Sequence, residues 1–206
     1  MKRTLILQLL TSFAVLSAAP LAWSATASDW PCVQRKVPEI SLAAIWPGPP
    51  LDAATKNWRE DAAIADLVQR LAVRRTSETE AAAAIAGLAS TSGNERKPRL
   101  LMLMAGLLET INAERAEVMA GLERFGDGQK QLAELLRMEN ADLAKMRSTS
   151  NADPAQLEQR LEQLNWNLRI FNERQKSLSS VCEVPVLIEQ RLFVLSREIQ
   201  KALQVP

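Results

Sequence analysis

Hydrophobic residues in the second half of the chain recur at alternating steps of three and four, the pattern of a helix that packs along one seam. The first seam is apolar except at Arg115, Gln129 and Glu139. Its positions are Leu108, Ile111, Arg115, Val118, Leu122, Phe125, Gln129, Leu132, Leu136, Glu139, Leu143 and Met146. The pattern predicts a helix over residues 98–147, with Pro98 in its first turn.

Two glycines, Gly126 and Gly128, lie within this predicted helix. Each should weaken a helix by about 1 kcal/mol, yet the seam keeps its phase across them. We therefore expect one helix with a soft or kinked point near Gly126. Two helices joined by a tight turn at this place are the alternative.

A second seam follows a polar loop at residues 148–151. Asp153 is expected to cap the helix, and Pro154 to take its first position. The seam positions are Leu157, Leu161, Leu164, Leu168, Phe171, Gln175, Leu178 and Cys182. The two apolar stripes face each other if the helices form an antiparallel, coiled-coil-like hairpin across the loop.

Two further expectations concern this hairpin. Arg115 is placed to pair with Glu162 or Glu173 of the second helix. Proline lacks the amide hydrogen and crowds the preceding turn, so Pro185 should end or kink that helix. A separate last helix over about residues 185–203 is then predicted. The first long helix would extend about 75 Å, so either the hairpin projects from the body or this helix is broken.

Shorter helical patterns precede the seams. Apolar spacing from Trp58 to Ala72 predicts a helix over residues 53–75. Ser77 and Glu80 have the spacing of a capping box, which opens a second, alanine-rich helix that ends near Ser90. These two shorter helices occupy residues 53–90, before the hairpin and terminal helix at residues 98–203.

Residues 28–51 contain five prolines, which forbid a sustained helix. The same stretch is too apolar for a free tail, since disordered segments are poor in such residues. We expect an irregular arm rich in proline and tryptophan, laid across a helical body. The fold class predicted for residues 28–206 is therefore a single all-α domain.

Residues 1–27 have the pattern of a secretory signal peptide. Lys2 and Arg3 precede an apolar stretch, and small residues follow at positions 25–27. Cleavage is expected after Ala27, with cleavage after Ser24 as the alternative. A retained N-terminal anchor is the rival interpretation, because the apolar stretch is barely long enough to span a bilayer. After cleavage, we expect a periplasmic or secreted protein without stable membrane insertion.

Export would place both cysteines, Cys32 and Cys182, in an oxidising compartment. Two cysteines allow one intramolecular pairing, which would fasten the arm to the second long helix. Pairing between two copies, or two buried free thiols, are the alternatives. A redox enzyme would prefer Cys-x-x-Cys or a nearby resolving thiol, and the sequence has neither.

Charge and composition argue against several classes of function. Without Lys2 and Arg3, 23 basic residues face 24 acidic ones, so the exported chain carries a net charge of −1. Nucleic acids bind clustered basic residues, so a nucleic-acid partner is not expected. The chain contains no histidine, the usual general base near neutral pH and a frequent metal ligand. We predict no catalytic residues, no metal site and no cofactor.

Four tryptophans outside the leader are candidate contact residues. Trp30, Trp46 and Trp58 lie in or near the arm, where they could attach it to the helices or stack a ligand. Trp166, beside the second seam, could cover the hairpin edge or face a partner. The arm tryptophans are expected to pack against the helices rather than to bind a ligand, because no convergent polar residues accompany them.

These patterns predict a non-catalytic protein that acts through protein–protein contact, as an accessory, scaffold or chaperone-like protein. Its partner would lie in the cell envelope, and a homodimer is compatible with this function. The alternative is a small-ligand binder that uses the tryptophan-rich arm. An enzyme that needs no histidine is a third hypothesis, for which the sequence indicates no substrate.

Overall fold

The computed structural model describes residues 30–52, 54–151 and 153–204, and every regular element in these ranges is helical. The predicted all-α class is therefore confirmed for the described residues, while the predicted signal peptide lies outside them. No helix in these ranges carries an apolar stretch that would cross a bilayer. The elements are α1 (Leu42–Ile45), η1 (Ala54–Glu60), α2 (Ala62–Ala72), α3 (Glu78–Thr91), η2 (Gly93–Glu95), α4 (Arg96–Ser148) and α5 (Pro154–Gln204).

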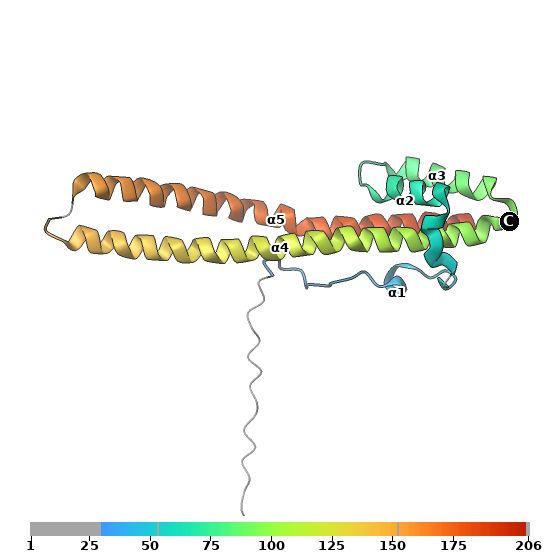
Figure 1. Cartoon of the computed structure of the whole chain (residues 1–206), viewed down its shortest axis with the longest axis horizontal. Coiled ribbons are helices and arrows are strands. Elements are labelled where there is room, and N and C mark those ends of the chain that lie inside the picture. The colour runs from blue at the N-terminus through green and yellow to red at the C-terminus, as the bar shows by residue number, and fades with distance from the viewer. Residues whose placement is uncertain (1–29, 53, 152, 205–206) are drawn as a thin grey trace, which may run out of the picture.

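Helices α4 and α5 form the predicted antiparallel hairpin and lie side by side along the long axis of the molecule (Figure 1). Helix α4 has 53 residues, about 80 Å at 1.5 Å per residue. It runs without a break through Gly126 and Gly128, so the alternative of two helices joined by a turn there is wrong. Packing against α5 on both sides of the glycines keeps this stretch helical.

Pro185 does not end the second helix. Helix α5 has 51 residues and contains Pro185 in its interior, so the predicted separate helix over residues 185–203 is wrong. An internal proline costs about 3 kcal/mol in an isolated helix. Here Cys182, Pro185 and Ile188 are all buried in the hairpin. Burial of the turns on both sides holds the helix together across the missing hydrogen bond.

The helix predicted over residues 53–75 is also wrong as a single element. Residues Ala54–Glu60 form a 3₁₀ segment, and α2 begins only at Ala62. Asp61 has an extended backbone, and its Oδ1 accepts the amides of Ala63 (3.0 Å) and Ile64 (3.1 Å). An aspartate in this geometry is an N-cap, and it starts a new helix.

The other predicted helix starts are confirmed. Ser77 and Glu80 form the capping box of α3, with the Glu80 amide 3.2 Å from Ser77 Oγ and the Ser77 amide 2.8 Å from Glu80 Oε2. Asp153 accepts the Ala155 amide (3.0 Å), and α5 begins at Pro154. Pro98 lies in the first turn of α4, which begins two residues earlier than predicted.

The main core lies at one end of the hairpin. In Figure 1, α2 and α3 lie on one side of α4 and α5, and the N-terminal arm runs along the other side. We call this end, with residues 96–128 and 176–204 of the long helices, the proximal half. Residues 129–151 and 153–175 form the distal hairpin. The proximal core includes Ile64, Leu71, Ile85, Leu100, Leu103, Met104, Leu107, Ile111, Ile188, Leu192, Leu195 and Ile199.

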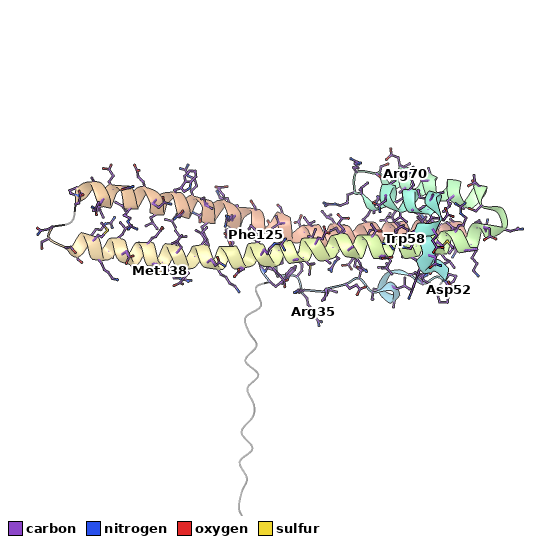
Figure 2. The ribbon with its side chains drawn as sticks, in the orientation of Figure 1. Arg35, Asp52, Trp58, Arg70, Phe125 and Met138 are labelled. Atoms are coloured by element: carbon purple, nitrogen blue, oxygen red, sulfur yellow. A yellow bond between two sulfur atoms is a disulfide. The ribbon has the colours of Figure 1, made fainter. Side chains whose placement is uncertain are left out.

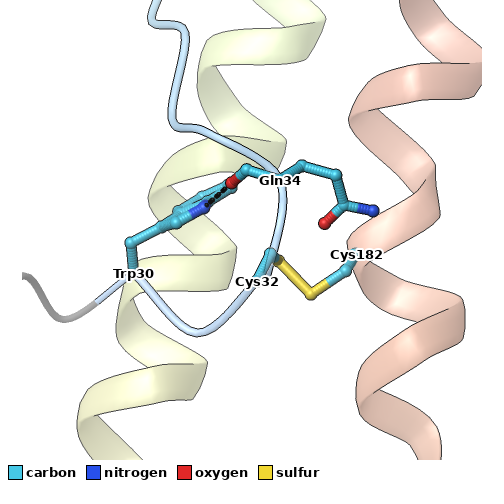
Figure 3. The surroundings of a disulfide bond; sticks show 4 residues. All are labelled: Trp30, Cys32, Gln34 and Cys182. Atoms are coloured by element: carbon cyan, nitrogen blue, oxygen red, sulfur yellow. Dashed lines mark hydrogen bonds between the residues drawn. A yellow bond between two sulfur atoms is a disulfide. The ribbon is translucent and has the colours of Figure 1, made fainter.

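The predicted disulfide between Cys32 and Cys182 is present, with 5.6 Å between the two Cα atoms (Figure 3). It fastens the start of the described arm to α5 near the middle of the hairpin. Further along the arm, Asn112 accepts the Ile40 amide (3.0 Å) and donates to the Ile40 carbonyl (3.1 Å). Ser196 donates to the Ile45 carbonyl at 2.9 Å. The predicted arm over residues 28–51 is thus observed from Trp30 onward, with α1 as its only regular turn among described residues.

Candidate functional site

The distal hairpin contains two helices and no third layer. No other described element covers it (Figure 1). Residues 129–148 of α4 extend it by about 30 Å beyond the proximal half. Its core consists of Leu136, Leu143 and Leu164, with partly buried neighbours Leu132, Leu157, Leu161 and Phe171. The predicted seams meet here, but each helix keeps most of its circumference in water.

Four large apolar side chains of the distal hairpin are exposed. They are Leu135 (39%), Met138 (52%), Trp166 (57%) and Leu168 (39%), and we call them the apolar belt. Figure 2 shows Met138 on the uncovered stretch of α4. Single exposed apolar residues are ordinary on a protein surface, whereas several at one place indicate a contact surface.

Leu168 was expected inside the second seam, and the structure corrects this. Asn167 is buried in its place, and Asn167 Nδ2 donates to both carboxylate oxygens of Glu139 at 3.1 Å. This charge-assisted contact orients α5 so that Asn167 points inward and Leu168 outward. Glu139, a predicted polar seam position, therefore pairs across the hairpin.

Gln129 also points into the hairpin, as predicted. Its Nε2 lies 3.4 Å from Gln175 Oε1 and 3.5 Å from the Phe171 carbonyl oxygen. Its Oε1 is buried without a hydrogen-bond partner among the described residues. Both distances are long for hydrogen bonds, so the pairing is weak. Gln129 marks the boundary between the proximal core and the distal hairpin.

Arg115 has a different role from the one predicted. It is 4% exposed, and its Nη1 donates to the Val37 carbonyl of the arm. Pairing with Glu162 or Glu173 is not observed among the described residues, and Glu173 instead accepts from Lys176 at 2.8 Å. Arg115 points toward the arm, because α4 is covered by the arm at this level. The residue helps to hold the arm in place.

The structure separates the four candidate tryptophans into two groups. The indole nitrogens of three of them donate hydrogen bonds: Trp30 to the Gln34 carbonyl (2.6 Å), Trp46 to the Pro49 carbonyl (2.7 Å) and Trp58 to Glu109 Oε2 (2.9 Å). Trp46 and Trp58 are buried in the proximal core. Trp166 is exposed on the distal hairpin.

A shallow groove lies between the arm, η1 and α4. Its volume is about 620 Å³, and Trp58 and Leu108 help to line it. Its apolar floor includes Leu42 and Leu51, and its rim carries charged side chains such as Lys56. An apolar floor with a few charged groups at the rim is typical of small-ligand sites.

The titratable groups are arranged as helix caps and ion pairs. Hydrogen bonds from Arg59 and Trp58 lower the pKa of the Glu109 carboxyl. The Ser77 amide and hydroxyl likewise lower the pKa of Glu80. Both shifts favour the ionised carboxylate, which suits a cap or an ion pair. Among the described residues, no group of three or more acidic or cysteine side chains is placed to hold a metal ion.

Arg191 explains how the end of α2 is fixed. It is buried, and its Nε and Nη2 donate to the Leu71 carbonyl at 3.1 and 2.9 Å. Burial lowers the pKa of this guanidinium, and the charge of Glu78 opposes that effect. A cation at the last turn of a helix satisfies its free carbonyls and its dipole. The contact ties α2 to α5.

Sequence reasoning included Trp166 among the contact candidates but missed the rest of the apolar belt. Leu135 and Met138 each directly precede a seam position of α4, so they lie on its flank rather than on the seam. Their spacing of three on one helix is a signal that sequence reading could have used. The exposure of Leu168 was not predicted, because its spacing fits the seam.

No protein-family model, no curated protein and no solved structure matches this chain. We therefore infer its function from its own residues and geometry.

Proposed function

We propose that this chain is a non-catalytic helical protein of the periplasm or the extracellular space, which acts through protein–protein contact. Its role would be that of an accessory, a scaffold or a chaperone-like protein. The observation that carries the proposal is the apolar belt on an uncovered two-helix projection. A packed proximal half and a disulfide-fastened arm would hold this projection in a fixed position.

The belt has the composition of a protein contact surface. Tryptophan and methionine are enriched in such interfaces, and tryptophan often supplies a large share of the binding energy. Four large apolar side chains exposed on the distal hairpin lower solubility and do not stabilise the folded chain. A partner that covers them gives this arrangement a physical reason.

Two further features support the proposed location. Residues 1–27 have the pattern of a signal peptide, and the chain contains a disulfide. Disulfides persist in exported proteins and are rare in the reducing cytosol. Cleavage after Ala27 would be shown by the N-terminal residue of the protein isolated from its cells, which should be Ser28.

The interaction can be tested in intact cells with a photo-crosslinking amino acid placed at Met138 or at Trp166. Both positions should give a reproducible crosslink to a defined protein species. The matched control is Leu187 on α5, which is 45% exposed but lies in the proximal half. Equal crosslinking at Leu187, or none at either belt position, would contradict the proposal.

The groove beside Trp58 favours a second candidate function, the binding of a small amphiphilic ligand. Trp58 lines this groove, so its fluorescence should respond to a ligand that enters it. Titration with envelope metabolites that combine an apolar body and a charged group would test this function. If the fluorescence of the folded protein did not change in any titration, this second function would be contradicted.

A further inference from the structure

A groove distinct from the one beside Trp58 lies between α5 and the loop that joins α2 to α3, residues 73–77 (Figure 1). We call it the loop groove. Its lining residues come from this loop, from the start of α3 and from α5. Its volume is about 460 Å³, which lies within the range of small-ligand sites.

The loop groove is lined by a buried cation that has no acidic partner. Arg191 is 9% exposed, and its Nε and Nη2 donate to the Leu71 carbonyl. Its Nη1 has no hydrogen-bond partner, and no carboxylate forms a salt bridge with it, among the described residues. Glu78 acts on it only as a charge through space. Buried charges are normally paired, so this guanidinium keeps N–H groups that an anion could accept.

A second arginine lines the same groove. Arg74 is exposed and forms neither a hydrogen bond nor an ion pair among the described residues. The described residues of the lining include these two arginines and one acidic residue, Glu78, so the lining carries one net positive charge. That charge matches a monoanion. The planar guanidinium groups suit the two oxygens of a carboxylate.

The start of α3 does not account for an anion site by itself. Ser77 and Glu80 already satisfy it through their capping box. The affinity for an anion would therefore come from the two arginines, and not from the free amides of a helix terminus.

The same groove has an apolar wall. Leu187 and Phe193 of α5 line it and are 45% and 46% exposed, and the partly buried Val194 lies between their turns. A bare anion such as acetate would leave this wall in water. An apolar or aromatic body attached to the anion would cover it.

The groove beside Trp58 differs in this respect. Its arginine, Arg59, already binds Glu109 through two hydrogen bonds of 3.0 Å. The loop groove combines free guanidinium groups with an exposed apolar wall, and this combination favours an anionic ligand.

We infer that the loop groove binds a small organic monocarboxylate with an apolar or aromatic body. The carboxylate would accept hydrogen bonds from Arg191 and Arg74, and the body would lie against Leu187 and Phe193. The site lies in the proximal half, away from the apolar belt, so this inference goes beyond the proposed function and does not rest on it.

Titration of the oxidised protein with phenylacetate, followed by the amide signals in a nitrogen–proton NMR spectrum, tests the inference. Signals of residues 73–78 and 187–194 should shift and saturate at millimolar probe. Phenylacetamide has the same body without the charge, and acetate has the charge without the body. Each should bind about tenfold more weakly than phenylacetate.

Two pairs of variants locate the site. Arg74→Gln should weaken phenylacetate binding about fivefold, whereas Arg75→Gln should leave it unchanged. Arg75 is an exposed arginine of the same loop that does not line this groove. Phe193→Ala should weaken binding about threefold. Its control is Val186→Ala, an exposed apolar position of α5 outside the lining, which should have no effect.

Arg191 is left unchanged in these variants, because it also holds the end of α2 and its loss would combine binding with folding. Absence of saturable shifts with phenylacetate, or equal binding of phenylacetamide, would overturn the inference. Equal weakening by Arg74→Gln and Arg75→Gln would also overturn it. Tighter binding of phenyl phosphate than of phenylacetate would overturn the choice of a monocarboxylate. None of these results depends on the crosslinks from the apolar belt, which test the proposed function separately.

Discussion

The proximal half and the distal hairpin are built from the same two helices, yet they differ in how much of each helix is buried. In the proximal half, α2, α3 and the arm cover α4 and α5, and large side chains such as Leu103 and Leu192 are completely buried. Among the described residues of the distal hairpin, the buried apolar core consists of three leucines. A continuous seam is thus not sufficient for a core, which requires a third layer.

The polar seam positions reveal the same difference. In the proximal half, Arg115 leaves the hairpin seam to bind a carbonyl of the arm. In the distal hairpin, Glu139 binds Asn167 of the facing helix. Where a third layer exists, a buried polar group fastens it. Where none exists, the polar group fixes the register of the two helices.

The largest expected effect concerns the disulfide that joins the arm to the hairpin. Replacing both cysteines, Cys32→Ser with Cys182→Ser, should lower the free energy of unfolding by about 5 kcal/mol on the chain-entropy model, because the bond joins residues separated by 150 positions. Urea unfolding followed by tryptophan fluorescence measures this change.

The same variant sharpens the comparison when hydrogen exchange is measured. Amides of the arm over residues 33–50 should lose protection, while residues 129–148 of the distal hairpin keep theirs. The intact protein under oxidising conditions is the control. Equal loss of protection in both regions would show that the halves do not differ in their dependence on the arm.

The second prediction compares one buried leucine from each half. Leu103→Ala removes a completely buried side chain from the proximal core, and we expect a loss of about 3–5 kcal/mol. Leu143→Ala should cost about 2–3 kcal/mol, since its small cluster borders solvent and can collapse around the space. Chemical unfolding of both variants measures the difference. Equal losses would mean that the distal cluster is as constrained as the proximal core.

Local signals in the sequence were sufficient for much of this fold. The capping box at Ser77, the cap at Asp153 and the alternating steps of the seams depend on neighbouring residues, and all three predicted their helices. The disulfide followed from the fact that only one intramolecular pairing exists. Such features are encoded within a few turns of chain or by simple counting.

The remaining features depend on contacts that one sequence does not display. Pro185 stays helical because turns on both sides are buried, which overrides its local preference. Asn167 replaces Leu168 in the seam because Glu139 lies opposite. The apolar belt was missed for the same reason, since exposure depends on which elements cover a helix. Tertiary packing, rather than spacing, decided these cases.

The third prediction uses two glycines of α4 that differ in their surroundings. A Cβ at Gly106 would lie 2.6 Å from Val68 Cγ2 and 2.8 Å from Trp58 Cδ2, so Gly106→Ala should destabilise the proximal half by about 1–3 kcal/mol. A Cβ at Gly128 would meet only Arg174 Nη1 at 4.0 Å. Gly128→Ala should therefore stabilise the protein by up to about 1 kcal/mol through helix propensity.

Thermal or chemical unfolding of the two variants gives the sign directly. The same substitution is expected to act in opposite directions, because α2 and η1 cover α4 at Gly106 and nothing comparable covers it at Gly128. Destabilisation by Gly128→Ala would indicate that flexibility near the boundary of the halves is required for the fold.

The smallest effect concerns acid stability. Burial raises the pKa of Asp61, but the Ile64 amide and Arg99 outweigh it, so the net pKa lies below the usual 3.8. Because the pKa is depressed in the folded state, the stabilisation is present above the unfolded value and lost as pH falls through the folded value. Asp61→Asn should keep part of the cap and remove this acid-dependent contribution, at most about 1 kcal/mol.

Unfolding measured between about pH 6 and about pH 2 tests this expectation. The matched control is Glu173→Gln in the distal hairpin, where the hydrogen bond from Lys176 also lowers the pKa of the Glu173 carboxyl. Since both groups of that pair are largely exposed, solvent screening should leave the acid dependence unchanged by this substitution. If Glu173→Gln changed the acid dependence of stability more than Asp61→Asn does, the prediction would be contradicted. The more strongly coupled charge would then lie in the distal hairpin.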